Sequence, residues 1–383
     1  MEIPVIIVII PVGFIFLLSG LMVNIIQAIL YITVRPFSKS MQRRLNKEIA
    51  ELLWLEVVWL FDWWAGMKIE LHTDTETFRL MGKERALLIC NHRSDIDWLI
   101  GWVLAQRTGC LGCTIAILKD VLKYLPVIGW SMWFSEYIFV KRRWAKDEHT
   151  LKSGFEHLKD SPVPFWLALF VEGTRFTQSK LLDAQQYAIS KGLPVPKHVL
   201  LPRTKGLTLA VKHMRSFTPA VYNITLSIAK DESPPSMLTI FKGKSAVVKV
   251  HLKRHLMHEL PETDDAIAQW CKDVFTDKDI FLEKYYSGGS FGSEQIQDIG
   301  RPKQSLIVMI VWSCLLSLAT IEFLLWTKLF STMKGIIIST VLLVFVTVIM
   351  QILILFTQSE PNIDSVPIKM LPNDPMREIL IKR

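Results

Sequence analysis

The stretch ALLICNHRSDIDWLIGWVLAQ, residues 86–106, decides the fold of the central part of this chain. ALLIC has the length and apolar character of a buried strand, and DIDWLIGWVLAQ behind it has the length of a helix. Strand-like apolar runs recur at 114–118, 137–140, 165–171 and 199–201. Helical stretches such as WAKDEHTLKSGFEHLKD and SKLLDAQQYAISKG lie between them. This alternation predicts an α/β domain with a largely parallel sheet flanked by helices.

Three apolar runs predict membrane helices. The first extends from Ile3 to Val34 without a charged residue, and it exceeds the roughly 20 residues that cross a bilayer. Two further runs begin at Ser305 and Gly335 and are joined by the short TKLFSTMK, which predicts a transmembrane hairpin. Glu322 lies inside the first of these two runs, where it either packs against a neighbouring helix, snorkels to the interface or has an active role.

We therefore divide the 383 residues into six segments. They are a transmembrane anchor at 1–34, a basic linker with a Trp-rich helix at 35–84, a core domain at 85–218, the C-terminal part of the same cytosolic domain at 219–300, the transmembrane hairpin at 301–358 and a cytosolic tail at 359–383. In the fourth segment, the strand-like AVYNITLSIA and SAVVKVHLK precede the helical DDAIAQWCKDVF.

The charge of the chain bears on its partners and on its orientation. The formal net charge is +8, and a basic excess suits nucleic acid, anionic membranes or anionic substrates. Because three apolar runs are present, we expect membrane lipids as partners and no nucleic acid. The basic segment RPFSKSMQRRLNK follows the first run, so the positive-inside rule predicts that it and the domain behind it are cytosolic.

The Trp-rich helix ELLWLEVVWLFDWWAG begins at Glu51 and contains Trp54, Trp59, Trp63 and Trp64. Because tryptophan prefers the headgroup region, we predict that this helix lies at the cytosolic surface of the membrane. The alternative is a buried helix of the soluble domain, because periodicity does not separate the two.

No set of residues has the spacing of a metal site. Cys110 and Cys113 form one Cys-x-x-Cys without a second pair, and reduced thiols are expected in the cytosol. The histidines of HLKRHLMH, His251, His255 and His258, have no acid or cysteine at ligand spacing. We interpret them as a solvated or membrane-facing basic edge.

His92, Asp95 and Asp97 interrupt the apolar sequence between the first strand and its helix. Ser94 and Asp97 have the spacing of a capping box, which gives the aspartates a structural role but leaves His92 unexplained. If the helix begins at Ser94, His92 lies on the connection and can fold back toward Asp97. An aspartate that holds one imidazole nitrogen leaves the other free as a base.

A general base acts on a nucleophile, and the sequence leaves two candidates for it, a cysteine and an alcohol of the substrate. No Gly-x-Ser-x-Gly motif is present, and Cys90 lies inside a strand, where it should pack as a small hydrophobic residue. We therefore favour an alcohol of the substrate, whose proton His92 removes. A covalent intermediate on cysteine is the alternative.

Basic motifs follow other predicted strands. Lys141, Arg142 and Arg143 lie in IFVKRRW, the stretch Glu172, Gly173, Thr174 and Arg175 lies in FVEGTRF, and Pro202, Arg203, Lys205 and Gly206 lie in LPRTKG. The carboxyl ends of parallel strands meet at one edge of a sheet, so these motifs can converge on His92. Arginines there suit capture of phosphate, and the Gly173 turn lets backbone amides approach an anion.

The motifs NHRSDIDW, IFVKR, FVEGTR and LPRTKG, in this order, resemble those of the glycerophospholipid acyltransferases. The flanking WLIGWVLAQRTG and LPVIGWSMWFSEY are similar to the eukaryotic 1-acylglycerol-3-phosphate acyltransferases of the plant type. The resemblance covers nearly the whole chain. His-x4-Asp alone is a weak signal, whereas four ordered motifs are a strong one.

The resemblance implies roles for individual residues. In the family, a histidine is the general base for the glycerol hydroxyl, an aspartate orients it, and acyl-CoA is the donor without a covalent intermediate, a cofactor or a metal. These roles fall on His92 and Asp97. The substrate-binding residues implied are Arg142 and Arg175 for the acceptor phosphate, Glu172 and Gly173 at the turn, Pro202 on the acyl-binding side, and Thr174, Arg203 and Lys205 beside them.

Three positions depart from the family pattern. Lys141 stands where many members have an acid, Phe176 where a serine is common, and Arg203-Thr204 where the fourth motif continues with apolar residues. These departures bear on the preference for acceptor and acyl chain more than on the type of reaction.

The resemblance implies a multi-pass enzyme of the endoplasmic reticulum membrane with a cytosolic catalytic domain. It would transfer an acyl group from acyl-CoA to the sn-2 hydroxyl of lysophosphatidate and form phosphatidate. One alternative is another lysophospholipid acceptor, such as lysophosphatidylinositol, and a second is a non-catalytic membrane scaffold that binds lipid. The C-terminal EILIKR does not match a dilysine retrieval signal, so the compartment rests on the resemblance.

Overall fold

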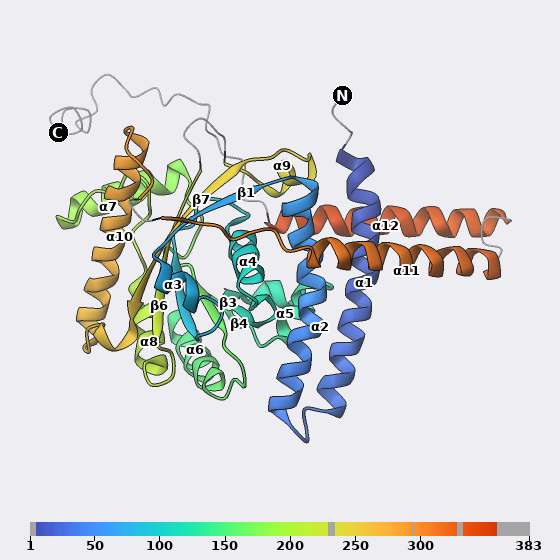
Figure 1. The fold of residues 1–383 in the computed structure, drawn as a ribbon, viewed down its shortest axis with the longest axis horizontal. Helices are drawn as coiled ribbons and strands as arrows, with labels where there is room; N and C mark the ends of the chain where they lie inside the picture. Colours follow the sequence, from blue (N-terminus) through green and yellow to red (C-terminus); the bar gives the residue numbers. More distant parts are fainter. Residues whose placement is uncertain (1–4, 229–233, 293–294, 328–331, 358–383) are drawn as a thin grey trace.

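A computed structural model describes residues 5–228, 234–292, 295–327 and 332–357. Its centre is an eight-stranded sheet in the order β4-β3-β5-β2-β6-β7-β1-β8 (Figure 1). The strands are β1 Lys68–His72, β2 Ala86–Cys90, β3 Thr114–Lys119, β4 Ile138–Val140, β5 Trp166–Leu169, β6 Ala220–Ile228, β7 Val247–Leu256 and β8 Ile296–Gln297. The predicted tail at 359–383 lies outside the described residues.

The parallel half of the sheet carries the predicted strands. β4, β3, β5, β2 and β6 pair in parallel, whereas β7 is antiparallel to β6 and parallel to β1. The predicted α/β fold with a largely parallel sheet is therefore confirmed. β1 and β8 extend the sheet beyond what the sequence predicted, and all five carboxyl ends of the parallel half lie along one edge.

The predicted strand at 199–201 is wrong. Val199 and Leu200 are buried, but the backbone there is a connection between α7 and α8. The carboxylate of Asp279 accepts the backbone N–H groups of Lys197, His198 and Val199, at 2.6–3.1 Å. A side chain thus satisfies amides that a neighbouring strand would otherwise bind, and β6 pairs with β2 instead.

Helices cover both faces of the sheet (Figure 1). Their bounds are α3 Thr75–Leu80, α4 Asp97–Arg107, α5 Ile128–Phe134, α6 Trp144–Lys159, α7 Gln178–Lys191, α8 Thr204–Met214, α9 Met237–Phe241 and α10 Asp264–Tyr286. Leu88 packs in the cluster that contains α4, and its neighbours Leu87 and Ile89 pack in the cluster that contains α6, α8 and α10. Because both faces are covered, β2 is apolar at every position.

The N-terminal helices are α1 Val5–Thr33 and α2 Lys39–Trp59, and α2 continues into the π-helical turn η1 Leu60–Trp64. Trp54 is fully buried, with its ring centroid 4.3 Å from that of Trp102 in α4. Asp62 and Arg107 form a buried pair with N···O distances of 2.7 and 2.8 Å. The buried-helix alternative therefore describes this part of the Trp-rich stretch, since α2 belongs to the core of the domain.

The C-terminal helices are α11 Gln304–Thr327 and α12 Met333–Thr357. Two of the described helices are long and apolar enough to cross a membrane, at Val8–Thr33 and Gln304–Thr327. α11 and α12 project away from the domain in one direction and run across α1 (Figure 1). Ile310, Leu318 and Ile321 on α11 are exposed, as expected for a helix whose surroundings are lipid.

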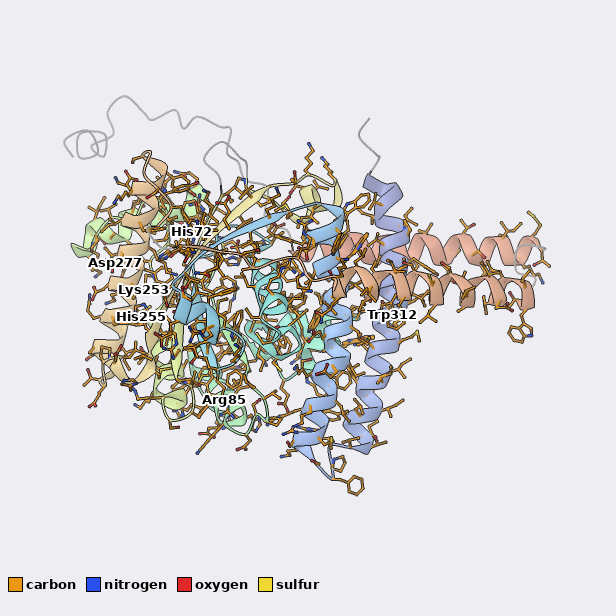
Figure 2. The ribbon with its side chains drawn as sticks, viewed as in Figure 1. His72, Arg85, Lys253, His255, Asp277 and Trp312 are labelled. Carbon is orange, nitrogen blue, oxygen red and sulfur yellow. The ribbon has the colours of Figure 1, made fainter. Side chains whose placement is uncertain are left out.

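The histidines of β7 differ from the interpretation as a basic edge. His258 is exposed, but the ring of His255 meets Trp270 edge to face with centroids 5.4 Å apart. His255 also lies on the far side of the molecule from Trp312 of α11 (Figure 2). Burial and Lys253 lower the pKa of His255 to about 4. This residue is therefore a neutral packing residue rather than part of a membrane-facing charge.

Two glycines test how α2 is attached to the domain. A Cβ at Gly112, in the 3-10 turn η2 Leu111–Cys113, would lie 2.3 Å from the backbone oxygen of Lys47 in α2. Gly112→Ala should lower the free energy of unfolding by about 1–3 kcal/mol, because that backbone contact must open. A Cβ at Gly101, inside α4, meets nothing within 4 Å, so Gly101→Ala should raise stability by up to about 1 kcal/mol.

The measurement is the thermal unfolding midpoint of the purified protein in detergent. Equal midpoints for the two alanine variants would contradict the close attachment of α2.

Candidate active site

His92 and Asp97 lie at the carboxyl end of β2, where the chain turns into α4. Nδ1 of His92 is 2.8 Å from Oδ2 of Asp97. The same oxygen accepts the backbone N–H groups of Arg93 at 2.7 Å and Ser94 at 2.9 Å. The Asp97 side chain is 2% exposed and that of His92 is 19% exposed. One buried carboxylate therefore closes the turn and holds the imidazole at the surface.

The predicted contact between His92 and Asp97 is present, and half of the predicted capping box is formed, because Asp97 accepts the backbone N–H of Ser94 while Ser94 caps no N–H of Asp97. α4 begins at Asp97, and no side chain bonds at its N-cap residue Ile96. The hydroxyl of Ser94 instead donates to the backbone oxygen of Pro235 at 2.5 Å. The Asp97 carboxylate is a stronger acceptor than a hydroxyl and takes the loop amides itself.

The other side of the imidazole is open. The His92 ring packs on Phe170 with centroids 4.4 Å apart, which fixes the plane of the ring. Within the described part of the chain, Nε2 of His92 has no hydrogen-bond partner. If Nδ1 carries the proton donated to Asp97, Nε2 is an acceptor at the surface. This arrangement can remove a proton from an incoming hydroxyl.

The third and fourth sequence motifs attach to this loop through their backbones. The N–H of Phe176 donates to the carbonyl of His92 at 2.7 Å, and that of Arg203 donates to Val171 at 2.7 Å. Gly173 has φ +71°, and a Cβ there would lie 3.0 Å from Cδ of Arg203. Glycine at 173 therefore allows both the turn and the passage of the Arg203 side chain.

Arg175 is a cation close enough to the pair to interact electrostatically with Asp97. Burial lowers the pKa of its guanidinium, while the charges of Asp95 and Asp97 raise it. Thr174, beside it, accepts a hydrogen bond from Nζ of Lys180 at 2.8 Å. A half-buried guanidinium close to His92 can bind an anionic group of a ligand.

The second motif forms a strained turn at the end of β4. Arg142 has φ 59°, and the Asp147 carboxylate accepts the N–H groups of Lys141 and Arg143, each at 2.7 Å. The side chains of residues 141–143 are exposed. β4 is three strands from β2 in the sheet, or about 14 Å at the usual strand spacing. Arg142 thus shares the sheet edge with His92 without contacting it.

Two further predicted residues lie at the rim of the site. Nζ of Lys205 lies 5.4 Å from the ring centroid of Trp144, so this side chain is engaged by an aromatic face. Pro202 is half-buried on the connection before α8. Within the described part of the chain, neither side chain hydrogen-bonds to His92, so their predicted roles remain predictions.

Glu172 does not lie where its predicted role requires. Its side chain is buried, and the backbone N–H groups of His92 and Leu200 interact with its carboxylate. Burial raises the pKa of Glu172 to about 8, although Lys278 lowers it. Because the carboxyl of Glu172 is buried, it is shielded from substrate. Glu172 therefore supports the loop that carries His92 and does not bind the substrate.

Lys278 was missed by the sequence analysis. Its Nζ donates to the carbonyl of Ile224 at 2.5 Å and to that of Ile89 at 3.3 Å. Burial lowers the pKa of Lys278 to about 8, while Cys90 and Glu172 raise it. The signal was its register on α10, because Val274, Phe275, Lys278, Leu282 and Tyr285 are all buried. A lysine on an apolar helix face is a buried charge that needs a partner.

Cys90 cannot readily act as the nucleophile. The thiol is buried, and burial raises its pKa strongly. Since the thiolate is the reactive form, this cysteine is inert in its resting environment. The residues that the structure describes also include no group of three or more His, Cys, Asp or Glu side chains placed to hold a metal ion. The burial of Cys90 favours a nucleophile that a ligand brings.

Comparisons with known proteins agree with this chemistry. Two family models match, Acyltransferase at residues 68–223 and Acyltransferase C-terminus at residues 239–312. The chain is 57% identical over 368 residues to 1-acyl-sn-glycerol-3-phosphate acyltransferase 2 of Arabidopsis thaliana, covering 96% of this chain and 94% of that protein. Its identity to the gamma form of Homo sapiens is 38% over 314 residues, covering 82% of this chain and 83% of that protein.

A solved structure also matches the chain. It is the 1-acyl-sn-glycerophosphate acyltransferase of Thermotoga maritima, at 16% identity and a TM-score of 0.38, and the match covers 70% of this chain and 97% of that one.

The buried pair of Glu172 and Lys278 predicts non-additive effects on stability. Lys278→Met should lower the free energy of unfolding by about 1–3 kcal/mol, because two buried carbonyls lose their donor. Glu172→Gln should also destabilise, because it removes the carboxyl whose electrostatic interaction raises the pKa of Lys278. The free energy of unfolding of the double variant should fall by less than the sum of the two single losses, with a difference of about 0.5–3 kcal/mol. Denaturant unfolding of the four proteins measures this coupling, and strictly additive effects would contradict it.

Proposed function

This chain belongs to the 1-acyl-sn-glycerol-3-phosphate acyltransferases, and we propose that it transfers an acyl group from acyl-CoA to the sn-2 hydroxyl of 1-acyl-sn-glycerol 3-phosphate, forming phosphatidate. The observation that carries this proposal is the 2.8 Å contact between Nδ1 of His92 and Asp97. It leaves Nε2 available for the acceptor hydroxyl.

In the proposed step, Nε2 of His92 takes the proton of the sn-2 hydroxyl as the oxygen attacks the thioester carbonyl. The new C–O bond forms, the C–S bond breaks, and the CoA thiolate leaves with the proton that His92 returns. Asp97 stabilises the imidazolium that exists between the two proton transfers. The inert Cys90 supports direct transfer, since this thiol offers no acceptor for the acyl group.

Recognition of the acceptor phosphate is assigned in the proposal to Arg175. In lysophosphatidate the phosphate is on the carbon next to the reacting hydroxyl, so the cation that binds it has to lie close to His92. Arg175 meets this requirement, because its charge acts on Asp95 and Asp97. Arg203, over Gly173, and Arg142, further along the edge, extend the basic surface. The half-buried position of Arg175 favours a phosphate monoester over a larger head group.

For the membrane arrangement, we propose that the hairpin of α11 and α12 crosses the endoplasmic reticulum bilayer and the catalytic domain faces the cytosol. Because these helices run across α1 (Figure 1), α1 would then lie along the membrane surface, which departs from the transmembrane anchor predicted for residues 1–34. Its exposed side chains, Ile25, Ile29 and Ile32, are 54–71% accessible and suit contact with lipid. The thioester donor would reach the site from the cytosol and the acceptor from the membrane.

The reaction is tested with labelled oleoyl-CoA, lysophosphatidate and membranes that contain the wild type or His92→Ala. Phosphatidate should form with the wild type, and the rate with His92→Ala should fall about 10²–10⁴-fold because the base is lost. The thermal unfolding midpoint of the variant should stay within a few degrees of the wild type. Transfer by His92→Ala at a near wild-type rate would contradict the assignment of the base.

The role of Arg175 predicts a selective loss. Arg175→Gln should raise KM for lysophosphatidate about tenfold or more and leave KM for acyl-CoA unchanged, because one charge-assisted contact to phosphate is removed. Arg79→Gln, at an exposed arginine of α3, is the matched control and should change neither constant. With lysophosphatidylinositol as acceptor, the wild type should be slower than with lysophosphatidate. An unchanged KM for lysophosphatidate in Arg175→Gln would exclude this role.

A further inference from the structure

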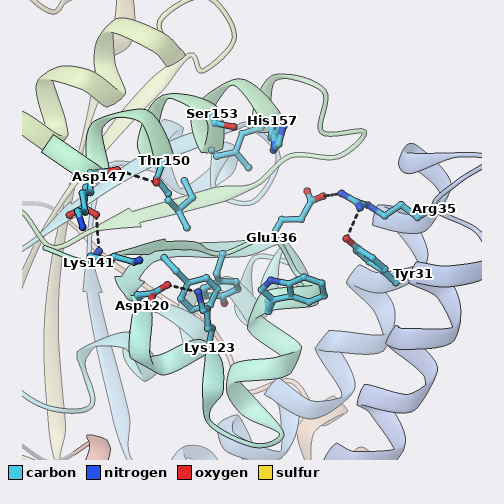
Figure 3. Close-up of a pocket in the computed structure, with 17 residues that line it drawn as sticks. Tyr31, Arg35, Asp120, Lys123, Glu136, Lys141, Asp147, Thr150, Ser153 and His157 are labelled. Atoms are coloured by element: carbon cyan, nitrogen blue, oxygen red, sulfur yellow. Dashed lines mark hydrogen bonds and ion pairs between the residues drawn. The ribbon is translucent and has the colours of Figure 1, made fainter. Parts of the chain in front are cut away.

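A cavity lies at the free edge of the sheet, outside β4. Its volume is about 530 Å³. It is bounded by α6, by the short 3-10 helix η3 Asp120–Tyr124, and by Tyr31 and Arg35 at the end of α1 (Figure 3). His92, Asp97 and Arg175 do not line it. It is therefore distinct from the catalytic surface, although Lys141 at its wall belongs to the second sequence motif.

The acids of the cavity are engaged with groups of the protein. Asp120 binds Lys123 at 2.6 Å, and Glu136 pairs with Arg35 at 3.9 Å (Figure 3). Glu136 also binds Arg43 at 2.8 Å. Asp147 is buried and accepts two backbone N–H groups of the β4 turn.

Two lysines of the cavity wall form no ion pair within the described residues. Lys141 and Lys146 are exposed, and within the described residues neither side chain has an ion pair. With the acids already bound, the wall offers an uncompensated positive charge to an anion.

Aromatic rings form the part of the cavity nearest α1. Tyr31, Trp133 and Phe139 line it, and the rings of Tyr31 and Trp133 have centroids 5.3 Å apart. Trp133 is 46% exposed, so part of its ring is accessible to a planar ligand. Free lysines beside an open aromatic ring are what a phosphorylated nucleotide needs, since the base stacks and the phosphates bind the ammonium groups.

We propose that this cavity binds the phosphorylated nucleotide end of the acyl-CoA donor. The proposal rests on the function proposed above, and three features select this occupant. A volume of about 530 Å³ suits a nucleotide and would remain mostly unfilled by a single lipid phosphate. β4, which borders the cavity, is three strands from β2, about 14 Å at ordinary strand spacing. The extended pantetheine arm can cover a separation of this order. The second motif also links the two places, because its turn presents Lys141 to the cavity.

The experiment measures binding of adenosine 3',5'-bisphosphate to the full-length protein in detergent by calorimetry. Lys146→Glu should weaken binding about tenfold or more and raise KM for acyl-CoA, with KM for lysophosphatidate unchanged. The matched control is Lys152→Glu. Lys152 lies on the same helix, pairs with Glu148 at 2.7 Å and is not part of the cavity wall. This control should bind the nucleotide as the wild type does.

Two further measurements separate the possible failures. His92→Ala should bind the nucleotide as tightly as the wild type, so a missing acyl transfer with intact binding would overturn the proposed function and not this site. Equal binding by Lys146→Glu and the wild type would overturn the site. So would displacement of labelled nucleotide by vesicles containing phosphatidate at equal phosphate concentration, because the cavity would then be a lipid headgroup site.

Discussion

The catalytic end of this protein depends on the carboxylate of Asp97. It is buried at the start of α4, where an unpaired charge would be costly, and it is stabilised by the His92 ring and the two amides of residues 93 and 94. The same contacts that make its burial possible set the direction of the imidazole. The local fold of the loop and the position of the base are thus one structural feature. The third motif adds a backbone bond to the carbonyl of His92, which fixes the loop from the other side.

Beneath this loop, the structure joins two segments that are far apart in the sequence. Lys278 belongs to the C-terminal match at 239–312, yet it donates to the carbonyl of Ile89 near the end of β2, inside the match at 68–223, and to that of Ile224 in the middle of β6, one residue beyond that match. Glu172, which precedes the Gly173 turn, interacts electrostatically with Lys278 and raises its pKa. The C-terminal segment therefore completes the floor of the catalytic loop, and the two matched regions form a single catalytic domain.

The parts of the fold that depend on local apolar patterns and on the ends of strands could be predicted from the sequence. Apolar runs located β2 to β6 correctly, and the contact of His92 with Asp97 followed from the strand-to-helix connection. The errors arose where a distant side chain intervened. Asp279 of α10 bound the amides of residues 197–199 and prevented a strand. The buried state of Glu172 depends on the packing of α10 under the sheet, which no local pattern encodes. The apolar face of α10 marks Lys278 as buried, but it does not show which carbonyls Lys278 binds. Trp54 was assigned to the membrane surface because apolar helices in a core and at an interface have the same composition.

The central claim is that His92 activates the acceptor hydroxyl and that the acyl group passes directly to it. The most direct test is to mix the protein with acyl-CoA labelled in the acyl chain, without acceptor, quench within milliseconds to minutes, and measure label bound covalently to the protein. The account predicts no labelled protein and no release of CoA until lysophosphatidate is added. A labelled protein that forms before acceptor is present, transfers its label to lysophosphatidate, and is absent in Cys90→Ala would contradict it.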